Sequence, residues 1–292
     1  MGQVVYCNGN YVEKDEAKVS VFDHGLLYGD GVFEGIRAYH GRVFKLEEHI
    51  NRLYESAQSI LLNIGIPKEE MAEIVLETLR RNQIREAYIR LVVTRGIGDL
   101  GLNPDNCPEA GIICITDNIS LFAPEVLEAG LEVKTVAIRR NNPDSLNPRI
   151  KSLNYLNNIL AKIEANLSKS PEAVLLNQEG YVTEGTGDNI FILQKGILKT
   201  PPLFVGVLEG ITRNTVLELA GKMGIKTSEE LFTRHDLYTA DECFLTGTAA
   251  EIVPVRMVDG RVVGEGRPGE VYKKLLAEFH KLTEVNGPLI FA

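Results

Sequence analysis

Four short apolar segments follow one another between residues 172 and 200, and they constrain the fold more than any other feature of the sequence. EAVLLN (172–177), GYVTEG (180–185), NIFILQ (189–194) and GILKT (196–200) are each bounded by Gly, Asn or Gln-Glu-Gly turns. Short runs rich in β-branched and aromatic residues, with turn residues at both ends, are typical of strands. We therefore expect a series of short strands in the second half of the chain.

Helices and further strands flank this region. In the second half, the patterns predict strands at LEVKTVAIRR (131–140) and ECFLTG (242–247) and a hairpin with Asp-Gly at its turn (253–263). They also predict a helix at about 153–168, a helix that begins near Ile211 and an amphipathic helix at 269–282. In the first half, strands within 3–45 precede helices at 46–62 and 68–82, and strands follow at 87–95 and 110–116. The chain is therefore predicted to be of mixed α+β class.

The chain is long enough for two domains. Its 292 residues allow one large domain or two of ordinary size. The stretch DNISLFAPEV (117–126) has neither a helical nor a strand period. We therefore expect an N-terminal α+β domain at 1–118, a connector at 119–126 and a C-terminal domain at 127–292.

Charge and composition argue against large charged or lipid partners. The formal net charge is −9, and no run of Lys or Arg exceeds two residues. A nucleic-acid-binding or anionic-membrane-binding protein normally carries a basic patch. No stretch approaches the roughly 18 apolar residues of a membrane span, and the N-terminus has no secretory pattern. We expect a cytoplasmic protein with small-molecule partners.

The cysteines and histidines do not suggest a metal site. The four cysteines, Cys7, Cys107, Cys114 and Cys243, form no CxxC pair. The five histidines show no HxxxH or similar spacing. The sequence therefore predicts free thiols in a reducing compartment and no structural zinc.

The glycine pattern GIGDLG (96–101) matches a dinucleotide-binding fingerprint in its letters only. In that fingerprint a helix starts within the glycines, because the pyrophosphate binds at the helix N-terminus. Here LNPDNCPEA follows, with two prolines and no helical period. We interpret the segment as a flexible loop, of the kind that can border a pocket.

Two junctions between loops and helices allow both a structural and a functional interpretation. The first junction is the end of the loop TPPLFVGVLEG, where the helix from Ile211 begins. The unpaired N–H groups in the first turn of that helix suit either an ordinary N-cap or a phosphate, and Thr212 adds a hydroxyl. Lys151 precedes Ser152, which we expect to be the N-cap of the following helix. A lysine there is either an exposed loop residue or a desolvated amine able to form an imine.

Two strand ends carry further candidates. YVTEGTGDN (181–189) places Glu184 at the end of a short strand, where it is either a surface carboxylate in a tight turn or a buried one aimed at a cation. LTGTAAE (245–251) ends a strand with small residues, so the backbone amides of Thr248 and Ala249 either approach a ligand or simply allow close packing.

Together these features resemble the fold-type IV enzymes that use pyridoxal 5′-phosphate (PLP), and the branched-chain aminotransferases most closely. The matching strings are DHGLLYGDGVFEGIRAY (23–39), EEHINRL (47–53), AYIRLVVTRG (87–96), KSLNYLN (151–157), EGTGDNIF (184–191), LEGITR (208–213) and TGTAAEI (246–252). They occur in the family's order over nearly the whole chain. The resemblance implies a small α/β N-terminal domain and a larger PLP-binding C-terminal domain with a β-barrel-like core.

The resemblance also implies a role for each matching residue. Lys151 is similar to the catalytic lysine that forms an imine with PLP and moves the substrate proton. The other implied cofactor-binding residues are Glu184 at the ring nitrogen, Tyr155 at the phenolic oxygen, Leu208 on the ring face, and Arg52, Ile211, Thr212 and Thr248 around the phosphate. The implied substrate-binding residues are Tyr28, Phe33, Gly35, Tyr88, Arg90, Thr248 and Ala249. Arg90 follows Tyr88 by two residues, which places both on the same side of their strand.

One segment departs from the pattern. Some members of the family place an aromatic residue of the connector over the substrate pocket, whereas this chain has SLFAP, with Leu121 or Phe122 in that neighbourhood.

By resemblance, the expected reaction is transamination of branched-chain L-amino acids with 2-oxoglutarate by at least a homodimer. The alternatives on the same fold are a D-amino-acid or (R)-amine transaminase and an aminodeoxychorismate lyase. FEGIRAY, YIR and the GIGDLG loop favour the branched-chain enzyme. The alternative from another functional class is a protein that binds PLP or another anion without catalysing a reaction.

Overall fold

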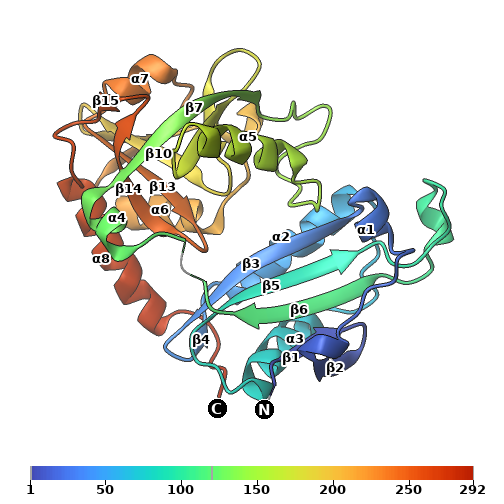
Figure 1. Cartoon of the computed structure of the whole chain (residues 1–292). Helices are drawn as coiled ribbons and strands as arrows, with labels where there is room; N and C mark the ends of the chain where they lie inside the picture. The colour runs from blue at the N-terminus through green and yellow to red at the C-terminus, as the bar shows by residue number, and fades with distance from the viewer. Residues whose placement is uncertain (1, 120, 292) are drawn as a thin grey trace. The chain divides into compact units, whose positions relative to one another are not determined.

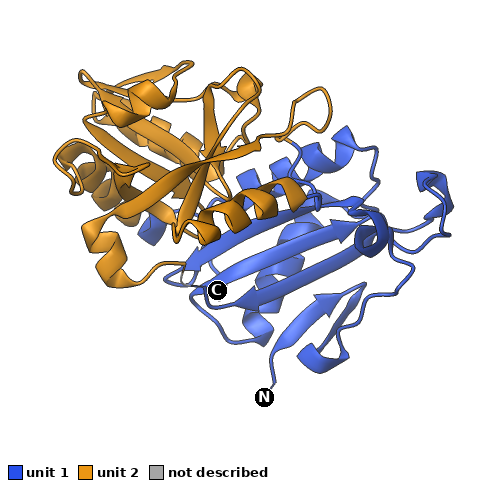
Figure 2. Cartoon of the chain, turned by 45° about the horizontal axis from the view of Figure 1, so that its top comes forward, with its two compact units in different colours: residues 1–119, 150–154, 282–292 blue, residues 120–149, 155–281 orange. Residues whose placement is uncertain are grey.

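The chain folds into two compact units. The computed structural model describes residues 2–119 and 121–291. Unit 1 comprises residues 2–119, 150–154 and 282–291, and unit 2 comprises residues 121–149 and 155–281 (Figure 2). Each unit has its own sheet and its own buried core.

The units differ from the expected domains in two segments. The division after residue 119 lies next to the expected end of the first domain at 118, but residues 150–154 and 282–291 belong with unit 1. Backbone hydrogen bonds give the reason: the Phe33 N–H donates to the Lys151 carbonyl, and the Ile290 N–H donates to the Gly41 carbonyl, both at 2.9 Å. Ser120, within the expected connector, lies outside the described residues.

Unit 1 is built on a six-stranded antiparallel sheet in the order β2-β1-β6-β5-β3-β4 (Figure 1). Its strands are β1 (Val4–Cys7), β2 (Asn10–Glu13), β3 (Gly31–Tyr39), β4 (Arg42–Val43), β5 (Ala87–Thr94) and β6 (Gly111–Asp117). Its helices are α1 (His24–Tyr28), α2 (Leu46–Ser59) and α3 (Lys68–Arg81). Helix α2 packs on β3, and α3 packs on β1 and β6.

Alternation along β3 and β5 separates a core face from a second face of this sheet. Ile36 of β3 and Ile89 and Leu91 of β5 are fully buried in the cluster that includes residues of α2 and α3. Because successive strand residues point to opposite sides, the residues between them lie on the other face. Phe33, Gly35, Tyr88 and Arg90 lie on that face.

Unit 2 is built on a closed six-stranded barrel, which confirms the expected β-barrel-like core of the second half. The barrel order is β9-β10-β13-β14-β7-β8, and β8 pairs with β9 to close it. Its strands are β7 (Leu131–Arg139), β8 (Glu172–Leu176), β9 (Val182–Gly185), β10 (Asn189–Gln194), β13 (Glu242–Gly247) and β14 (Glu251–Val258). The strands β11 (Ile197–Thr200), β12 (Lys226–Glu229) and β15 (Arg261–Val262) extend the sheet outside the closed ring.

The helices of unit 2 are α4 (Pro124–Ala129), α5 (Leu156–Leu167), α6 (Ile211–Lys222), α7 (Arg234–Tyr238) and most of α8 (Glu270–Val285), whose residues from 282 on belong to unit 1. Helix α5 packs on β7 and β8, and α6 packs on β12 and β13. No helix within the described residues is long and apolar enough to cross a membrane.

The predicted N-cap at Ser152 is wrong. Helix α5 begins at Leu156 with Tyr155 as its N-cap residue, and Ser152 instead forms an antiparallel bridge with Val32 of β3. Residues 151–153 are therefore extended along the sheet of unit 1, because their backbone groups find partners there. The short elements α1, α4, α7 and β12 were not predicted, since four to six residues carry too little periodic pattern.

Candidate functional site

Lys151 lies at the edge of β3 in unit 1. Its carbonyl accepts the Phe33 N–H, and its own N–H donates to Ser56 Oγ of α2 at 3.2 Å. Its side chain is partly buried, and Nζ lies 4.6 Å from the centre of the Phe33 ring. The backbone is thus held from both sides, and the amine is presented on the face of an aromatic ring.

A second cation lies on the same ring. Arg90 Cζ is 4.6 Å from the centre of the Phe33 ring, and Arg90 Nη2 donates to the Tyr88 hydroxyl oxygen at 3.0 Å. The predicted same-side arrangement of Tyr88 and Arg90 is therefore confirmed. Gly35 lies directly opposite Arg90 in the β3–β5 register. Two cationic side chains beside one aromatic wall suit a ligand that carries both an anionic and an apolar group.

Glycine is required at position 35 by the packing of Tyr88. A Cβ at Gly35 would overlap the Tyr88 hydroxyl oxygen and would lie 2.9 Å from Tyr88 Cζ. The absence of a side chain at Gly35 therefore sets where the Tyr88 hydroxyl can lie.

Tyr28 is held by the glycine-rich loop 96–101. Its hydroxyl donates to the Leu100 carbonyl at 2.6 Å, and its ring meets the His24 ring edge-on with 5.0 Å between centres. His24 Nε2 in turn lies 2.8 Å from the Asp99 carbonyl oxygen. Residues 96–101 are all described and no helix begins among them, so the interpretation of this segment as a loop is confirmed.

Arg52 is held in a buried ion pair that the sequence analysis did not predict. Its Nε and Nη2 donate to the two Glu34 carboxylate oxygens at 2.7 and 2.8 Å, and Arg52 is 7% exposed. His49, one helical turn before Arg52 on α2, lies with Nδ1 2.7 Å from Glu34 Oε2. Because a carboxylate can only accept, Nδ1 carries the hydrogen. The signal was a carboxylate in an apolar strand together with His and Arg three residues apart on a helix.

The ionisation of this cluster follows from its burial and its charges. Burial raises the pKa of Glu34, but the charges of Arg52 and His49 and their hydrogen bonds outweigh it and hold that pKa well below the ordinary value. Burial lowers the pKa of His49, and the charges of Arg52 and Lys151 lower it further, against the opposite effect of the Glu34 carboxylate. Glu34 is therefore ionised at neutral pH, with Arg52 as its charged partner.

Glu184 is the centre of a buried polar network in unit 2. It is 4% exposed, and its Oε1 accepts from Arg140 Nε at 2.7 Å. Its Oε2 accepts from the backbone N–H of Leu208 at 2.9 Å and from Asn189 Nδ2 at 3.2 Å. Of the two interpretations left open by the sequence, the buried carboxylate aimed at a cation is therefore the correct one.

Arg140 and Asn189 were missed by sequence reasoning. Arg140 follows the last residue of β7 and is 44 residues from Glu184 along the chain, so no local pattern links them. Asn189 lies opposite Glu184 in the β9–β10 register and opposite Thr246 in the β10–β13 register. Glu184, Asn189 and Thr246 therefore form one row across neighbouring strands. The hydroxyl of Thr246 is buried and has no hydrogen-bond partner among the described residues.

The predicted phosphate-binding residues lie at the start of α6 and in the turn after β13. Ile211 is the first residue of α6, and the N-cap residue Gly210 supplies no capping side chain. Thr212 is buried, and Thr248 and Ala249 lie in the turn between β13 and β14. The first N–H groups of an α-helix have no intrahelical partner, so this end of α6 can receive an anion.

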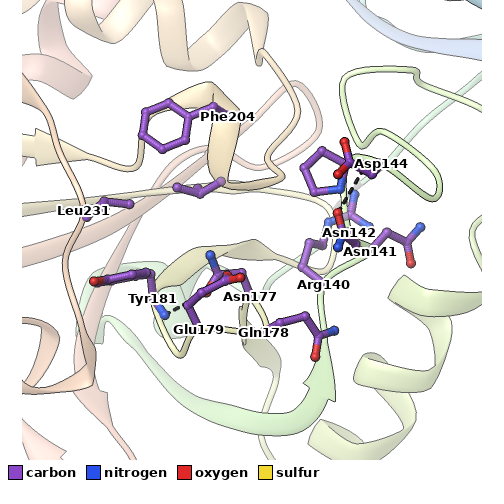
Figure 3. Close-up of a pocket in the computed structure, with 12 residues that line it drawn as sticks. Arg140, Asn141, Asn142, Asp144, Asn177, Gln178, Glu179, Tyr181, Phe204 and Leu231 are labelled. Atoms are coloured by element: carbon purple, nitrogen blue, oxygen red, sulfur yellow. Dashed lines mark hydrogen bonds between the residues drawn. The ribbon is translucent and has the colours of Figure 1, made fainter.

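A cavity of about 390 Å³ lies beside this network in unit 2 (Figure 3). Amide side chains line it together with apolar residues such as Phe204 and Leu231, and Figure 3 shows Asn142 and Asn177 hydrogen-bonded to neighbouring backbone N–H groups. Arg140 lines the cavity and also contacts Glu184.

The predicted residues thus fall into one set in each unit. Unit 1 holds Lys151, Phe33, Gly35, Tyr88, Arg90, Arg52 and Tyr28, and unit 2 holds Tyr155, Glu184, Leu208, Ile211, Thr212, Thr248 and Ala249. Phe122, one of the two connector residues considered for the pocket, packs against the barrel core of unit 2, whereas Leu121 is exposed. Within the part of the chain that the structure describes, no group of three or more His, Cys, Asp or Glu side chains is arranged to hold a metal ion.

Known proteins match this chain over most of its length. The sequence model of the family described as amino-transferase class IV matches residues 31–258. A protein of Methanocaldococcus jannaschii that is provisionally named a branched-chain-amino-acid aminotransferase is 58% identical over 94% of this chain and 94% of its own length.

Solved structures match nearly the whole chain. The Escherichia coli branched-chain amino acid aminotransferase has a TM-score of 0.94 at 36% identity, covering 99% of this chain and 97% of that one. A T.th. branched-chain amino acid aminotransferase, complexed with N-(5′-phosphopyridoxyl)-L-glutamate, has a TM-score of 0.92 at 36% identity, covering 99% of this chain and 96% of that one. The predicted fold type is therefore confirmed.

Proposed function

This chain belongs to amino-transferase class IV, and on that premise we propose that it transfers the amino group of branched-chain L-amino acids to 2-oxoglutarate, with PLP as cofactor. The products are the 2-oxo acid and L-glutamate. The observation that carries the proposal is the cluster of unit 1 in which Lys151 and Arg90 each lie 4.6 Å from the centre of the Phe33 ring. The cluster combines an amine, a guanidinium and an apolar wall.

The residues present fit the chemistry of PLP. The cofactor has an aldehyde, a ring nitrogen, a phenolic oxygen and a phosphate; when bound, it supplies a carbonyl that takes up the amino group and a ring that accepts electrons. The fit rests on the row of Glu184, Asn189 and Thr246, where the buried Thr246 hydroxyl has no partner among the described residues. A site lined by such a row is suited to a polar ligand.

We assign each cofactor group to residues of this chain. Lys151 would hold the aldehyde carbon, Glu184 the ring nitrogen and Tyr155 the phenolic oxygen. The first turn of α6, with Thr212, Thr248 and Arg52, would hold the phosphate, while Leu208 would pack on the ring. The side-chain amide of Asn189 donates to Glu184 at 3.2 Å and to the Leu208 carbonyl at 2.8 Å. One amide therefore holds two of these residues in place.

The protein's part in the reaction is to bind, to orient and to move protons. The Lys151 amine would take the proton from the substrate Cα and return it at the neighbouring cofactor carbon. Tyr88 and the backbone amides of Thr248 and Ala249 would bind the substrate carboxylate, and Arg90 would receive the side-chain carboxylate of glutamate. Phe33 and Tyr28 would contact the apolar side chain in the other half-reaction.

We also propose that the protein acts in the cytoplasm as a homodimer or a larger homo-oligomer. Five apolar residues of α5 are exposed, and their spacing places them on one helical stripe: Leu156, Ile159, Leu160, Ile163 and Leu167. An exposed apolar stripe of this kind is typical of a protein–protein contact. The cytoplasmic assignment is supported by the four free cysteines.

A panel of amino donors with 2-oxoglutarate tests the proposed function. We expect L-leucine, L-isoleucine and L-valine to yield L-glutamate, and each to convert the protein-bound cofactor to its amine form, which is followed by absorbance. D-alanine and (R)-amines are the matched controls and should give no reaction. Rapid turnover of D-alanine without any on L-leucine would instead identify a D-amino-acid transaminase.

Replacing Gly35 by alanine tests the substrate-binding role of Tyr88. The added methyl group must displace the Tyr88 hydroxyl and break its hydrogen bond from Arg90. We expect KM for the amino donor to rise, because the methyl group moves the hydroxyl that would bind the substrate carboxylate, and the free energy of unfolding to fall by about 1–3 kcal/mol, the usual cost of overpacking. Gly221→Ala is the control, because a Cβ at Gly221 would meet no atom within 4 Å. An unchanged KM in Gly35→Ala would remove Tyr88 from the substrate site.

A further inference from the structure

Arg140 is the one cation hydrogen-bonded to Glu184 among the described residues, and nothing in the proposed function uses it. Its Nε donates to Glu184 Oε1 at 2.7 Å, and Arg140 is 6% exposed. The remaining donors to Glu184 are neutral: the Leu208 N–H and the Asn189 amide. One buried guanidinium is therefore the counter-charge of this carboxylate among the described residues.

The guanidinium is itself fixed in position. Arg140 Nη1 donates to Asn157 Oδ1 at 3.1 Å and to Asn158 Oδ1 at 3.3 Å, both near the start of α5. The Asn157 amide donates to the Arg139 carbonyl at 2.8 Å, and the Arg140 N–H donates to the Leu176 carbonyl at 2.9 Å. The guanidinium is thus anchored to α5 and the backbone to β8. A side chain held this firmly presents its charge at one place, as a positioning group requires.

We propose that Arg140 is the positioning residue that keeps Glu184 an ionised acceptor, so that the proton shared between Glu184 and the cofactor ring nitrogen stays on the nitrogen. The inference rests on the proposed function, because it assumes that Glu184 faces that nitrogen. A buried carboxylate without a paired cation is costly, and taking up a proton removes that cost. If Arg140 lost its charge, the shared proton would move to Glu184, and the ring would become a weaker acceptor of electrons.

The test compares Arg140→Met with Arg140→Lys in the holoenzyme. Arg140→Met keeps an unbranched side chain of similar length without the charge, whereas Arg140→Lys keeps the charge without the fork of donors. The readout is the ¹⁵N chemical shift of the pyridine nitrogen in enzyme loaded with ¹⁵N-labelled PLP, together with kcat and KM for L-leucine. Arg267→Met is the matched control, since Arg267 also pairs with a glutamate of unit 2, Glu265, but on the exposed surface.

We expect Arg140→Met to move the ¹⁵N shift to that of an unprotonated ring and to lower kcat by about 10- to 100-fold, a size typical of removing a group that orients a functional ligand. KM should change less than kcat, because Arg140 is not among the proposed substrate-binding residues. Arg140→Lys should retain the shift of the protonated ring, and the control should match the wild type. A protonated ring and a normal kcat in Arg140→Met would overturn the inference.

Comparison of a double variant with Glu184→Gln keeps the inference testable if Arg140→Met does not fold. The double variant Arg140→Met/Glu184→Gln buries neither charge unpaired. We expect its kcat to equal that of Glu184→Gln within about twofold, because Arg140 acts only through the carboxylate. A further tenfold loss would overturn the inference. If Glu184→Gln itself leaves the ¹⁵N shift and kcat unchanged, the proposed role of Glu184 fails, and the inference fails with it.

Discussion

Replacing Lys151 by alanine is expected to abolish transamination, with kcat lowered by about 10⁴-fold or more, because one side chain would both bind the cofactor and move the substrate proton. The absorption band of the covalently bound cofactor should disappear as well. Both are measured on purified protein, the first by single-turnover reaction with L-leucine and the second by its absorption spectrum. If the variant kept both activity and band, Lys151 would not be the cofactor lysine.

The substitution should leave the fold intact. Lys151 Nζ lies over the Phe33 ring of β3, but two hydrogen bonds from its backbone hold residue 151 to β3 and α2 in unit 1: its carbonyl accepts the Phe33 N–H and its N–H donates to Ser56 Oγ. Alanine retains both groups. We therefore expect the unfolding temperature of cofactor-free Lys151→Ala to match that of the cofactor-free wild type. Lys281→Ala, at an exposed lysine of α8, is the matched control and should keep full activity.

Replacing Glu34 by glutamine is expected to lower the free energy of unfolding by about 3–5 kcal/mol, the usual cost of removing one partner of a buried ion pair. Glutamine has the same shape but removes the carboxylate charge that faces the buried Arg52 guanidinium. Urea denaturation of the cofactor-free protein measures the change. Glu209→Gln is the control: Glu209 pairs with Arg149 at 2.9 Å on the surface, where such pairs contribute about 0–1 kcal/mol. Equal losses in the two variants would show that the Glu34 cluster contributes no more than a surface pair.

The same cluster predicts how stability depends on pH. Burial raises the pKa of Glu34, but Arg52 and His49 outweigh it, so the folded-state pKa lies well below the ordinary value of 4.5. The unfolded state therefore binds the proton first, and the stabilisation is present above pH 4.5 and is lost as the pH falls below it. Burial also lowers the pKa of His49 from 6.5, which adds a loss of stability in the same direction below that pH. We expect the free energy of unfolding of the wild type to fall on acidification. In Glu34→Gln, the fall that occurs below pH 4.5 should be missing.

The helices and strands illustrate what a local pattern can predict. The apolar spacing of 46–62 predicted α2, and the alternation of 87–95 predicted β5, because both periods are set by the backbone within a few residues. Turn residues marked the ends of β10 and β13 to the residue. The elements that were missed, such as α1 and α7, have five residues each, too few for a helical period to be visible.

The residues proposed for the site were named from the sequence, but the side chains that hold them in place were not. Resemblance of KSLNYLN and EGTGDNIF to a family pointed to Lys151 and Glu184. Their partners were not predicted: Glu34 pairs with Arg52 across 18 residues, and Glu184 pairs with Arg140 across 44. A partner at that separation depends on which helix packs on which strand and on the order of the strands, and these are properties of the tertiary structure.

The sequence by itself therefore predicted the α+β class and most of the elements, and its resemblance to a family named the candidate site residues. The tertiary structure alone decided that residues 150–154 join unit 1, that Lys151 and Arg90 share the Phe33 ring, and that Glu34 and Glu184 each have an arginine beside them. The physical reason is that periodicity and turn chemistry act between near neighbours in the chain. The charge and position of a buried group are set by whatever the fold places against it, because a buried charge needs a partner wherever in the chain that partner lies.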